Sequence, residues 1–133
     1  MNYLLDTDTV VGFLRGQEPV VQKFQMTPAE TLAVSAITLA ELYHGASRSS
    51  RPQHNTLHVR RLENSIQIID FDAAAAAQFG ALRSDLERAG KRLDDLDLLL
   101  ASTALTRGLT LVTHNLAHFG RVPNLAIEDW IKD

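Results

Sequence analysis

Tyr3-Leu4-Leu5-Asp6-Thr7-Asp8 is the stretch that decides the fold class, because a short apolar run ends there directly in acidic residues. A run of this kind is typical of a buried strand. Similar runs recur at residues 32–35, 66–69, 109–113 and, more weakly, 125–127. Short apolar strands that alternate with helical stretches predict a parallel sheet covered on both faces. We therefore expect a three-layer α/β fold with a parallel sheet of about five strands flanked by helices.

The stretches between these runs have helical spacing. Apolar residues surround most of a helix over residues 37–46, and further helices are expected over residues 71–89, which are rich in alanine, and 96–107. Gly90 and Gly108 close the last two, and glycine readily takes the left-handed conformation at a helix end. With 133 residues and no repeat or linker, the chain is expected to be one domain, residues 1–133.

Composition excludes several classes of protein. The chain has no cysteine, which rules out disulfides, thiolate zinc sites and a cysteine nucleophile. Its net charge of −3 gives no general signature of a nucleic-acid binder. No apolar run approaches the roughly 20 residues that span a bilayer, and the first residues lack the basic flank of a signal peptide. We expect a soluble, cytoplasmic domain with no membrane association.

Acidic residues follow the predicted strands. The positions are Asp6 and Asp8 after the first strand, Glu41 in the helix after the second, Asp94, Asp95 and Asp97 before the fourth, and Thr113, His114 and Asn115 at the end of the fourth. In an open α/β sheet, ligands bind beyond the carboxyl ends of the strands. A structural role is the alternative for each acid: Asp6 or Thr7 as a helix cap, Thr38 and Glu41 as a capping box, and Asp94 to Asp97 as an acidic first turn.

Spacing within the helices favours a functional role for three of the acids. Glu41 lies at the border of an apolar helix face, and Asp97 stands among leucines where a solvated acid is unusual. If Asp6, Glu41 and Asp97 converge at about 5 Å, their mutual repulsion reaches roughly 10 kcal/mol at an effective dielectric of about 20. Such a cluster needs raised pKa values or a bound cation, and oxygen ligands suit Mg²⁺ or Mn²⁺.

In these residues the chain resembles the PIN-domain ribonucleases, and specifically the VapC toxins of bacterial toxin–antitoxin pairs. The matching segments, in chain order, are residues 3–8 (YLLDTD), 35–42 (SAITLAEL) with Gly45-Ala46, 97–102 (DLLLAS), 111–115 (LVTHN) and 127–130 (IEDW). They run in order from residue 3 to residue 130 and so extend over nearly the whole chain. The sequence departs from the family at the positions of a frequent fourth acid, which here are Asn115 and His118.

The resemblance implies a PIN-like fold and a metal-dependent endoribonuclease that uses Asp6, Glu41 and Asp97. Asp6 and Asp97 are expected to hold Mg²⁺ or Mn²⁺, Glu41 to orient or deprotonate the attacking water, and Thr113 and Asn115 to position the site. His118 is expected at the surface or beside the substrate. The resemblance also implies an RNA substrate, a homodimer and a cognate small VapB-like antitoxin. An acid-free stretch, residues 42–62, carries four arginines that are candidates for phosphate binding.

Three alternatives remain at this point. A haloacid-dehalogenase-like phosphatase would use Asp6 as nucleophile and Asp8 as acid and base, with Lys91 and Asp94-Asp95 in later motifs. A receiver-like signalling domain would bind Mg²⁺ through Asp6 and Asp8 and accept phosphate on Asp70. An inactive PIN fold would act only as an interaction module. The phosphatase interpretation leaves Glu41 and Asp97 without a role.

Overall fold

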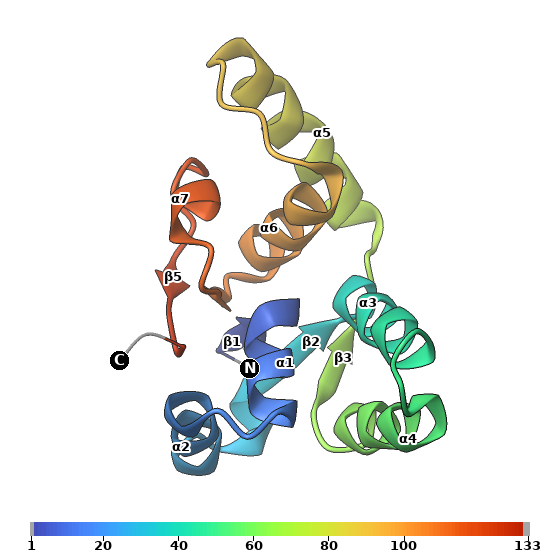
Figure 1. The fold of residues 1–133 in the computed structure, drawn as a ribbon. Helices are drawn as coiled ribbons and strands as arrows, with labels where there is room; N and C mark the ends of the chain where they lie inside the picture. The colour runs from blue at the N-terminus through green and yellow to red at the C-terminus, as the bar shows by residue number, and fades with distance from the viewer. Residues whose placement is uncertain (1, 132–133) are drawn as a thin grey trace.

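The computed structural model describes residues 2–131 and contains one five-stranded sheet with helices around it (Figure 1). The strands are β1 (Tyr3–Leu5), β2 (Leu32–Ser35), β3 (Gln67–Ile69), β4 (Thr110–Val112) and β5 (Ile127–Glu128). The helices are α1 (Thr7–Leu14), α2 (Glu18–Met26), α3 (Ala36–Ser47), α4 (Pro52–Glu63), α5 (Ala73–Arg88), α6 (Asp95–Arg107) and α7 (Leu116–Phe119), with a short 3₁₀ turn, η1 (Ala29–Thr31). Among the described residues, no helix has the length and apolarity needed to cross a bilayer.

The sheet confirms the predicted number of strands and their parallel direction. Its order is β3-β2-β1-β4-β5, and every neighbouring pair is parallel. Strand β1 occupies the centre, where Leu4 lies between Ala33 of β2 and Leu111 of β4. From β1, the strands β2 and β3 follow in order towards one edge of the sheet. The chain then crosses back, and β4 and β5 follow in order towards the opposite edge. The carboxyl ends of β1 and β4 therefore form the point where the strand order reverses.

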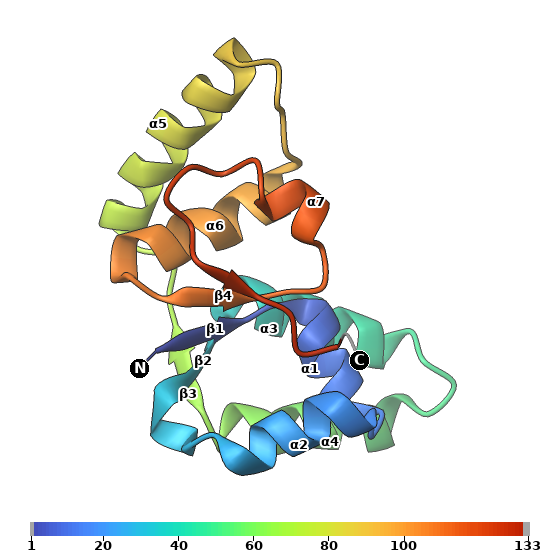
Figure 2. The same cartoon turned by 90° about the vertical axis from the view of Figure 1, so that its left-hand side faces the viewer.

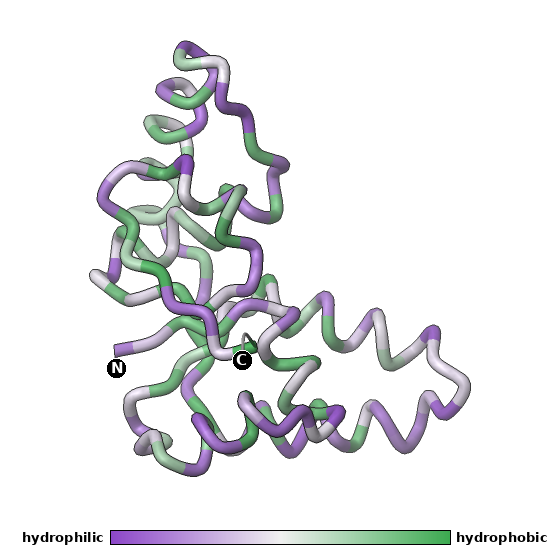
Figure 3. The backbone as a smooth tube through the Cα atoms, turned by 60° about the vertical axis from the view of Figure 1, so that its left-hand side comes forward, coloured by the Kyte–Doolittle hydropathy of each residue, from purple (hydrophilic) through white to green (hydrophobic). Residues whose placement is uncertain are grey.

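Alternating side chains of each strand enter two separate hydrophobic cores, which confirms the three layers. Leu4 and Leu111 pack with α5 and α6, whereas Leu5 and Val112 pack with α1, α3 and α4. Figure 2 shows α5 and α6 on one side of the sheet and α1, α2 and α4 on the other. Hydrophobic residues are concentrated where the strands meet, and hydrophilic ones are frequent at the far ends of the helices (Figure 3).

Three strands differ from the expected runs: β5 is Ile127–Glu128 in place of residues 125–127, and β3 and β4 are shorter because adjoining helices use part of the predicted runs. The Ile66 amide donates to Leu62 O at the end of α4, and the Leu109 amide donates to Ala104 O at the end of α6. Because Ile66 and Leu109 are held by these helix-end hydrogen bonds, β3 starts at Gln67 and β4 starts at Thr110. The predicted role of the two glycines at helix ends is confirmed. Gly90 and Gly108 have φ values of 69° and 65°, in the left-handed region.

Candidate active site

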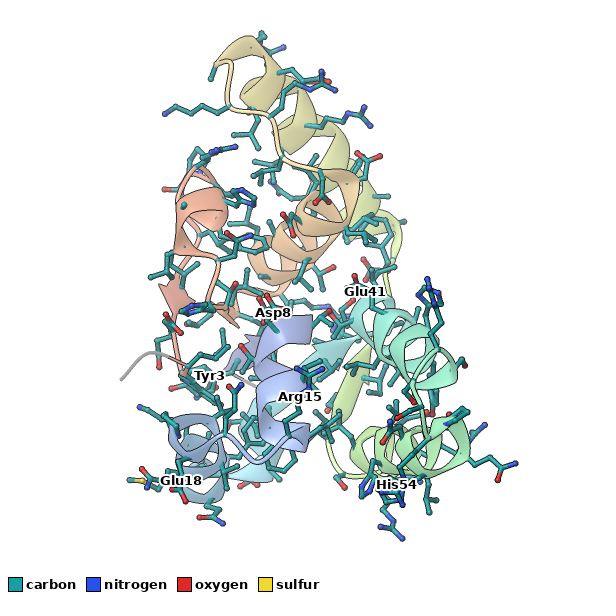
Figure 4. The ribbon with its side chains drawn as sticks, viewed as in Figure 1. Tyr3, Asp8, Arg15, Glu18, Glu41 and His54 are labelled. Atoms are coloured by element: carbon teal, nitrogen blue, oxygen red, sulfur yellow. The ribbon has the colours of Figure 1, made fainter. Side chains whose placement is uncertain are left out.

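Four of the five predicted site residues line one pocket at the carboxyl end of the sheet. The cavity has a volume of about 210 Å³ and is lined by Asp6, Thr7, Asp8, Ile37, Thr38, Glu41, Asp94, Leu96, Asp97, Leu100, Asn115 and Phe119. Its walls come from α1, α3, the start of α6 and the segment after β4. Figure 4 shows Asp8 at the beginning of α1 and Glu41 on α3, both on the side that faces α6. We call this cavity the carboxylate pocket.

Asp6 lies directly after β1 and has two roles. It is the N-cap of α1, where its Oδ1 accepts a hydrogen bond of 2.9 Å from the Thr9 amide, so the predicted capping role is confirmed. The residue is only 5% exposed. Burial raises the pKa of Asp6 above its usual range, and the neighbouring charge of Asp8 adds to the rise, while hydrogen bonds from Thr113 and Thr9 oppose it. A carboxylate in this environment is stabilised by a cation.

Glu41 lies in the second turn of α3, and the predicted capping box is wrong. Ser35 is the N-cap of this helix and accepts from the Ile37 amide at 2.9 Å, so Glu41 is too far along the helix to reach back to the cap. Its Oε1 instead accepts a hydrogen bond of 2.6 Å from Thr7 Oγ1, across 34 positions of sequence. This bond attaches the Glu41 carboxylate to the first turn of α1 and holds it at the wall of the pocket.

Asp97 enters the pocket from the first turn of α6. Asp94 is the N-cap of that helix and accepts a hydrogen bond from the Asp97 amide at 3.2 Å. The Asp97 carboxylate itself therefore does not cap the helix. The Asp97 side chain is 22% exposed. Burial raises the pKa of Asp97, and the charges of Asp94 and Asp6 contribute, opposed by His118. Asp6 and Asp97 therefore repel each other in the folded protein.

The end of β4 contributes a support beneath the pocket. Thr113 is fully buried and is not part of the pocket lining. Its Oγ1 accepts from the Asn115 amide at 3.0 Å, and its side chain also hydrogen-bonds to Asp6. The Asn115 side chain does line the pocket. Thr113 thus connects the backbone after β4 to the carboxylate after β1.

The structure brings two further residues, His118 and Thr38, to the site. His118, expected only at the surface or beside the substrate, has its Nδ1 2.8 Å from Asn115 Nδ2 and 3.6 Å from Asp97 Oδ2. Thr38 lines the pocket with a buried hydroxyl that has no hydrogen-bond partner within the described part of the chain. The earlier signs were the position of His118 at the family's frequent fourth acid and that of Thr38 in the same predicted helix as Glu41.

The donors around the carboxylate pocket fit a divalent cation that retains water. Five carboxylate side chains and Asn115 line it, together with the unpaired Thr38 hydroxyl, and neither lysine nor arginine is among the lining residues. Within residues 2–131, no three acidic or histidine side chains are gathered closely enough to hold an ion by themselves. Mg²⁺ usually keeps several waters and uses one or two carboxylates, a mode that this spacing allows.

Each of two alternative functions lacks one residue that it needs at this pocket. Asp70, the phosphate acceptor of a receiver-like domain, is exposed after the edge strand β3, and it does not line the pocket. Lys91, needed by the phosphatase, is exposed in the turn after α5 and is also absent from the lining. Asp8 and Asp94 of the phosphatase set line the pocket with Asp6, so what this alternative lacks there is its lysine.

Comparison with known proteins gives consistent matches over the whole chain. Residues 3–125 match the PIN domain family. The chain is 34% identical over 131 residues to the tRNA(fMet)-specific endonuclease VapC of Salmonella typhimurium, covering 98% of each chain. It is 36% identical over 134 residues to the ribonuclease VapC2 of Rickettsia felis, covering 99% of this chain and all of that protein. The crystal structure of DNA-bound VapBC from Salmonella typhimurium superimposes with a TM-score of 0.92 over 98% of each chain, at 34% identity.

Proposed function

Since the chain belongs to the PIN-domain family and is a VapC-type ribonuclease toxin of the VapBC toxin–antitoxin systems, we propose that it hydrolyses RNA phosphodiester bonds at the carboxylate pocket with the help of Mg²⁺ or Mn²⁺. The observation that supports the proposed use of a metal ion is the composition of the carboxylate pocket. Asp6, Glu41, Asp97 and Asn115 come from four separate segments and line one cavity, and burial raises the pKa of both aspartates.

The chain's own residues have distinct tasks in this reaction. Asp6 and Asp97 hold the cation, which when bound lowers the pKa of water and polarises a phosphate oxygen. Glu41, fixed through one oxygen by Thr7, uses its other oxygen to orient the attacking water and to accept its proton. Thr113 keeps Asp6 in place from below, and Asn115 positions the substrate side of the pocket.

The proposed substrate is the initiator tRNA, because the Salmonella relative is named for that activity and matches this chain over nearly its full length. We also propose a cognate VapB-like antitoxin as partner, on the basis of the related VapBC complex. A homodimer, action in the cytoplasm and a single nuclease domain over residues 1–133 complete the proposal.

Cleavage of initiator tRNA by the purified protein tests this function. Cleavage should be lost in EDTA and return on addition of Mg²⁺ or Mn²⁺, while circular dichroism shows an unchanged fold. Full cleavage in EDTA would contradict the role of the carboxylates as cation ligands. A protein that is folded and metal-loaded but cuts no RNA would contradict the ribonuclease proposal as a whole.

A further inference from the structure

A second cavity adjoins the carboxylate pocket, on the far side of Glu41. Its volume is about 380 Å³, and it lies between α1, α3 and α4. Its lining consists of Thr7, Val11, Leu14, Arg15, Glu41, Leu42, Gly45, Ala46, Ser49, Asn55, His58 and Val59. Thr7 and Glu41 line both cavities, so the hydrogen bond between them forms the partition. We call this second cavity the α1–α4 pocket.

The α1–α4 pocket combines an apolar floor with a polar rim. Leu42, Ala46 and Val59 are buried beneath it, whereas Ser49 and Asn55 carry hydrogen-bonding groups at its edge. The Asn55 side chain donates from Nδ2 to Ser49 Oγ at 2.8 Å, and its Oδ1 makes no hydrogen bond to the described residues, so Oδ1 is available as an acceptor. Apolar walls with a few placed polar groups are typical of small-ligand sites of 300–1,000 Å³. They suit a planar ring whose edge forms hydrogen bonds.

Charge distinguishes the two cavities. Five acids line the carboxylate pocket, whereas Glu41 in the partition is the single acid among the residues that line the α1–α4 pocket. Arg15 lines the α1–α4 pocket, and Figure 4 shows it at the opposite end of α1 from Asp8. Arg48 follows directly at the end of α3. An RNA strand that approaches the five acids of the carboxylate pocket needs positive charge along its path. Arg15 and Arg48, on the α1–α4 pocket side of Glu41, provide that charge.

From this continuity, size and charge we propose that the α1–α4 pocket binds the base of a nucleotide next to the scissile phosphate of the RNA, and so determines which sequence is cut. The inference rests on the proposed ribonuclease function and deepens it. Single-stranded RNA is read by its unstacked bases, whose faces contact apolar or ring side chains and whose edges form hydrogen bonds. Asn55 on the rim provides the edge contacts, and Arg15 binds the adjoining phosphate.

Two glycines allow a matched test that fills the pocket without damaging the fold. Gly45 lines the α1–α4 pocket, and a Cβ at this position meets no atom within 4 Å. Gly80 lies within α5, outside the lining of both cavities, and a Cβ there also meets nothing within 4 Å. Gly45→Leu and Gly80→Leu both replace a helical glycine by a better helix former, so neither is expected to lower stability. Only Gly45→Leu occupies the base site.

Nucleotide binding is measured first, without metal and independently of cleavage. The metal-free protein is titrated with each of the four nucleoside 5′-monophosphates while the NMR signals of Asn55 and His58 are followed. At least one nucleotide should shift these signals in the wild type and in Gly80→Leu, with at least a tenfold weaker Kd in Gly45→Leu. If none of the four shifts them, or if Gly45→Leu binds as tightly as the control, the inference is wrong.

Cleavage of initiator tRNA then connects the pocket to the reaction. Gly45→Leu should lower kcat/KM at least tenfold relative to Gly80→Leu, and equal values would overturn the role in cleavage. A Gly45→Leu protein that keeps nucleotide binding and cleavage but loses the antitoxin would show that the pocket contacts protein, which also overturns the inference. Wild type that binds nucleotides here yet cuts no RNA would contradict the proposed function and still support the binding site.

Discussion

Asp6→Asn separates the structural role of this residue from its electrostatic one. Asn caps a helix about as well as Asp, so the acceptor for the Thr9 amide is kept. Asp72→Asn is a matched control, because Asp72 is the N-cap of α5 and accepts from the Ala75 amide at the same distance, 2.9 Å. The two sites differ in burial: Asp6 is 5% exposed, and the Asp72 side chain is 46% exposed.

The expected magnitude follows from that difference. Asp6→Asn removes a buried charge next to Asp8 and Asp97, and we expect the metal-free protein to gain about 1–3 kcal/mol at pH 7. For a chain of this length, a melting temperature shift of about 3 °C accompanies each kcal/mol. Asp72→Asn gives up only the exposed ion pair with Arg107 at 3.6 Å, so it should cost about 0–1 kcal/mol.

Thermal melts in EDTA and in excess Mg²⁺ measure both effects. Mg²⁺ at a hundred times its Kd should stabilise the wild type by about 2.7 kcal/mol and Asp6→Asn by much less, so the higher melting temperature of Asp6→Asn in EDTA should shrink towards that of the wild type or fall below it. Asp72→Asn should respond to Mg²⁺ like the wild type. If Asp6→Asn is less stable than the wild type in EDTA and gains as much from Mg²⁺, the buried-charge argument is refuted.

The pH dependence of the same variant has a defined sign. Because burial raises the pKa of Asp6 above its ordinary value of 3.8, the folded state holds this proton more tightly than the unfolded state does. Stability from this group is therefore present at low pH and is lost as pH rises from 3.8 through the folded pKa. Urea unfolding in EDTA should show the advantage of Asp6→Asn growing across that window and then staying constant.

Three further variants test the other side chains of the site. Glu41→Gln should lower kcat for RNA cleavage by at least about 100-fold, whereas Asp8→Asn should have a mild effect; the opposite order, with turnover of phosphate monoesters, would favour a phosphatase. Thr7→Val should lower kcat about tenfold with little change in KM, because Glu41 loses its hydrogen bond, and Thr7→Ser should retain activity; equal loss in both would indicate a packing role. Asp97→Asn should weaken Mg²⁺ binding in calorimetry while the metal-free protein stays as stable or becomes more stable; a less stable variant that responds normally to Mg²⁺ would make Asp97 a structural residue.

The sheet was predictable because both faces of its strands are buried. Leu4 and Leu5 point into the two opposite cores, so neighbouring positions of β1 are both apolar. The same holds for Leu111 and Val112 of β4. Helices α2 and α4 leave a weaker signal. Only Val20 of α2 is fully buried, so most of that helix carries no apolar pattern for a sequence argument to use.

The position of each acid along the sequence indicated which residues belong to the site. The sequence did not indicate which side chains contact one another there. Asp6 follows a strand and Asp97 stands among leucines, which are local signals of a functional acid. The bond from Thr7 to Glu41 joins residues 34 positions apart, and it depends on how α1 lies against α3. The approach of His118 to Asp97 likewise depends on the path of the chain after β4. Such contacts are set by tertiary packing.

The central position of β1 has a consequence for synthesis of the toxin in the cell. Strand β1 leaves the ribosome well before its sheet partner β4, and Asn115 follows still later. At about 5–20 residues per second, roughly 5–20 s separate Asp6 from Asn115 on the nascent chain. The carboxylate pocket is therefore incomplete until Asn115 has left the ribosome, and a shorter nascent chain cannot form it.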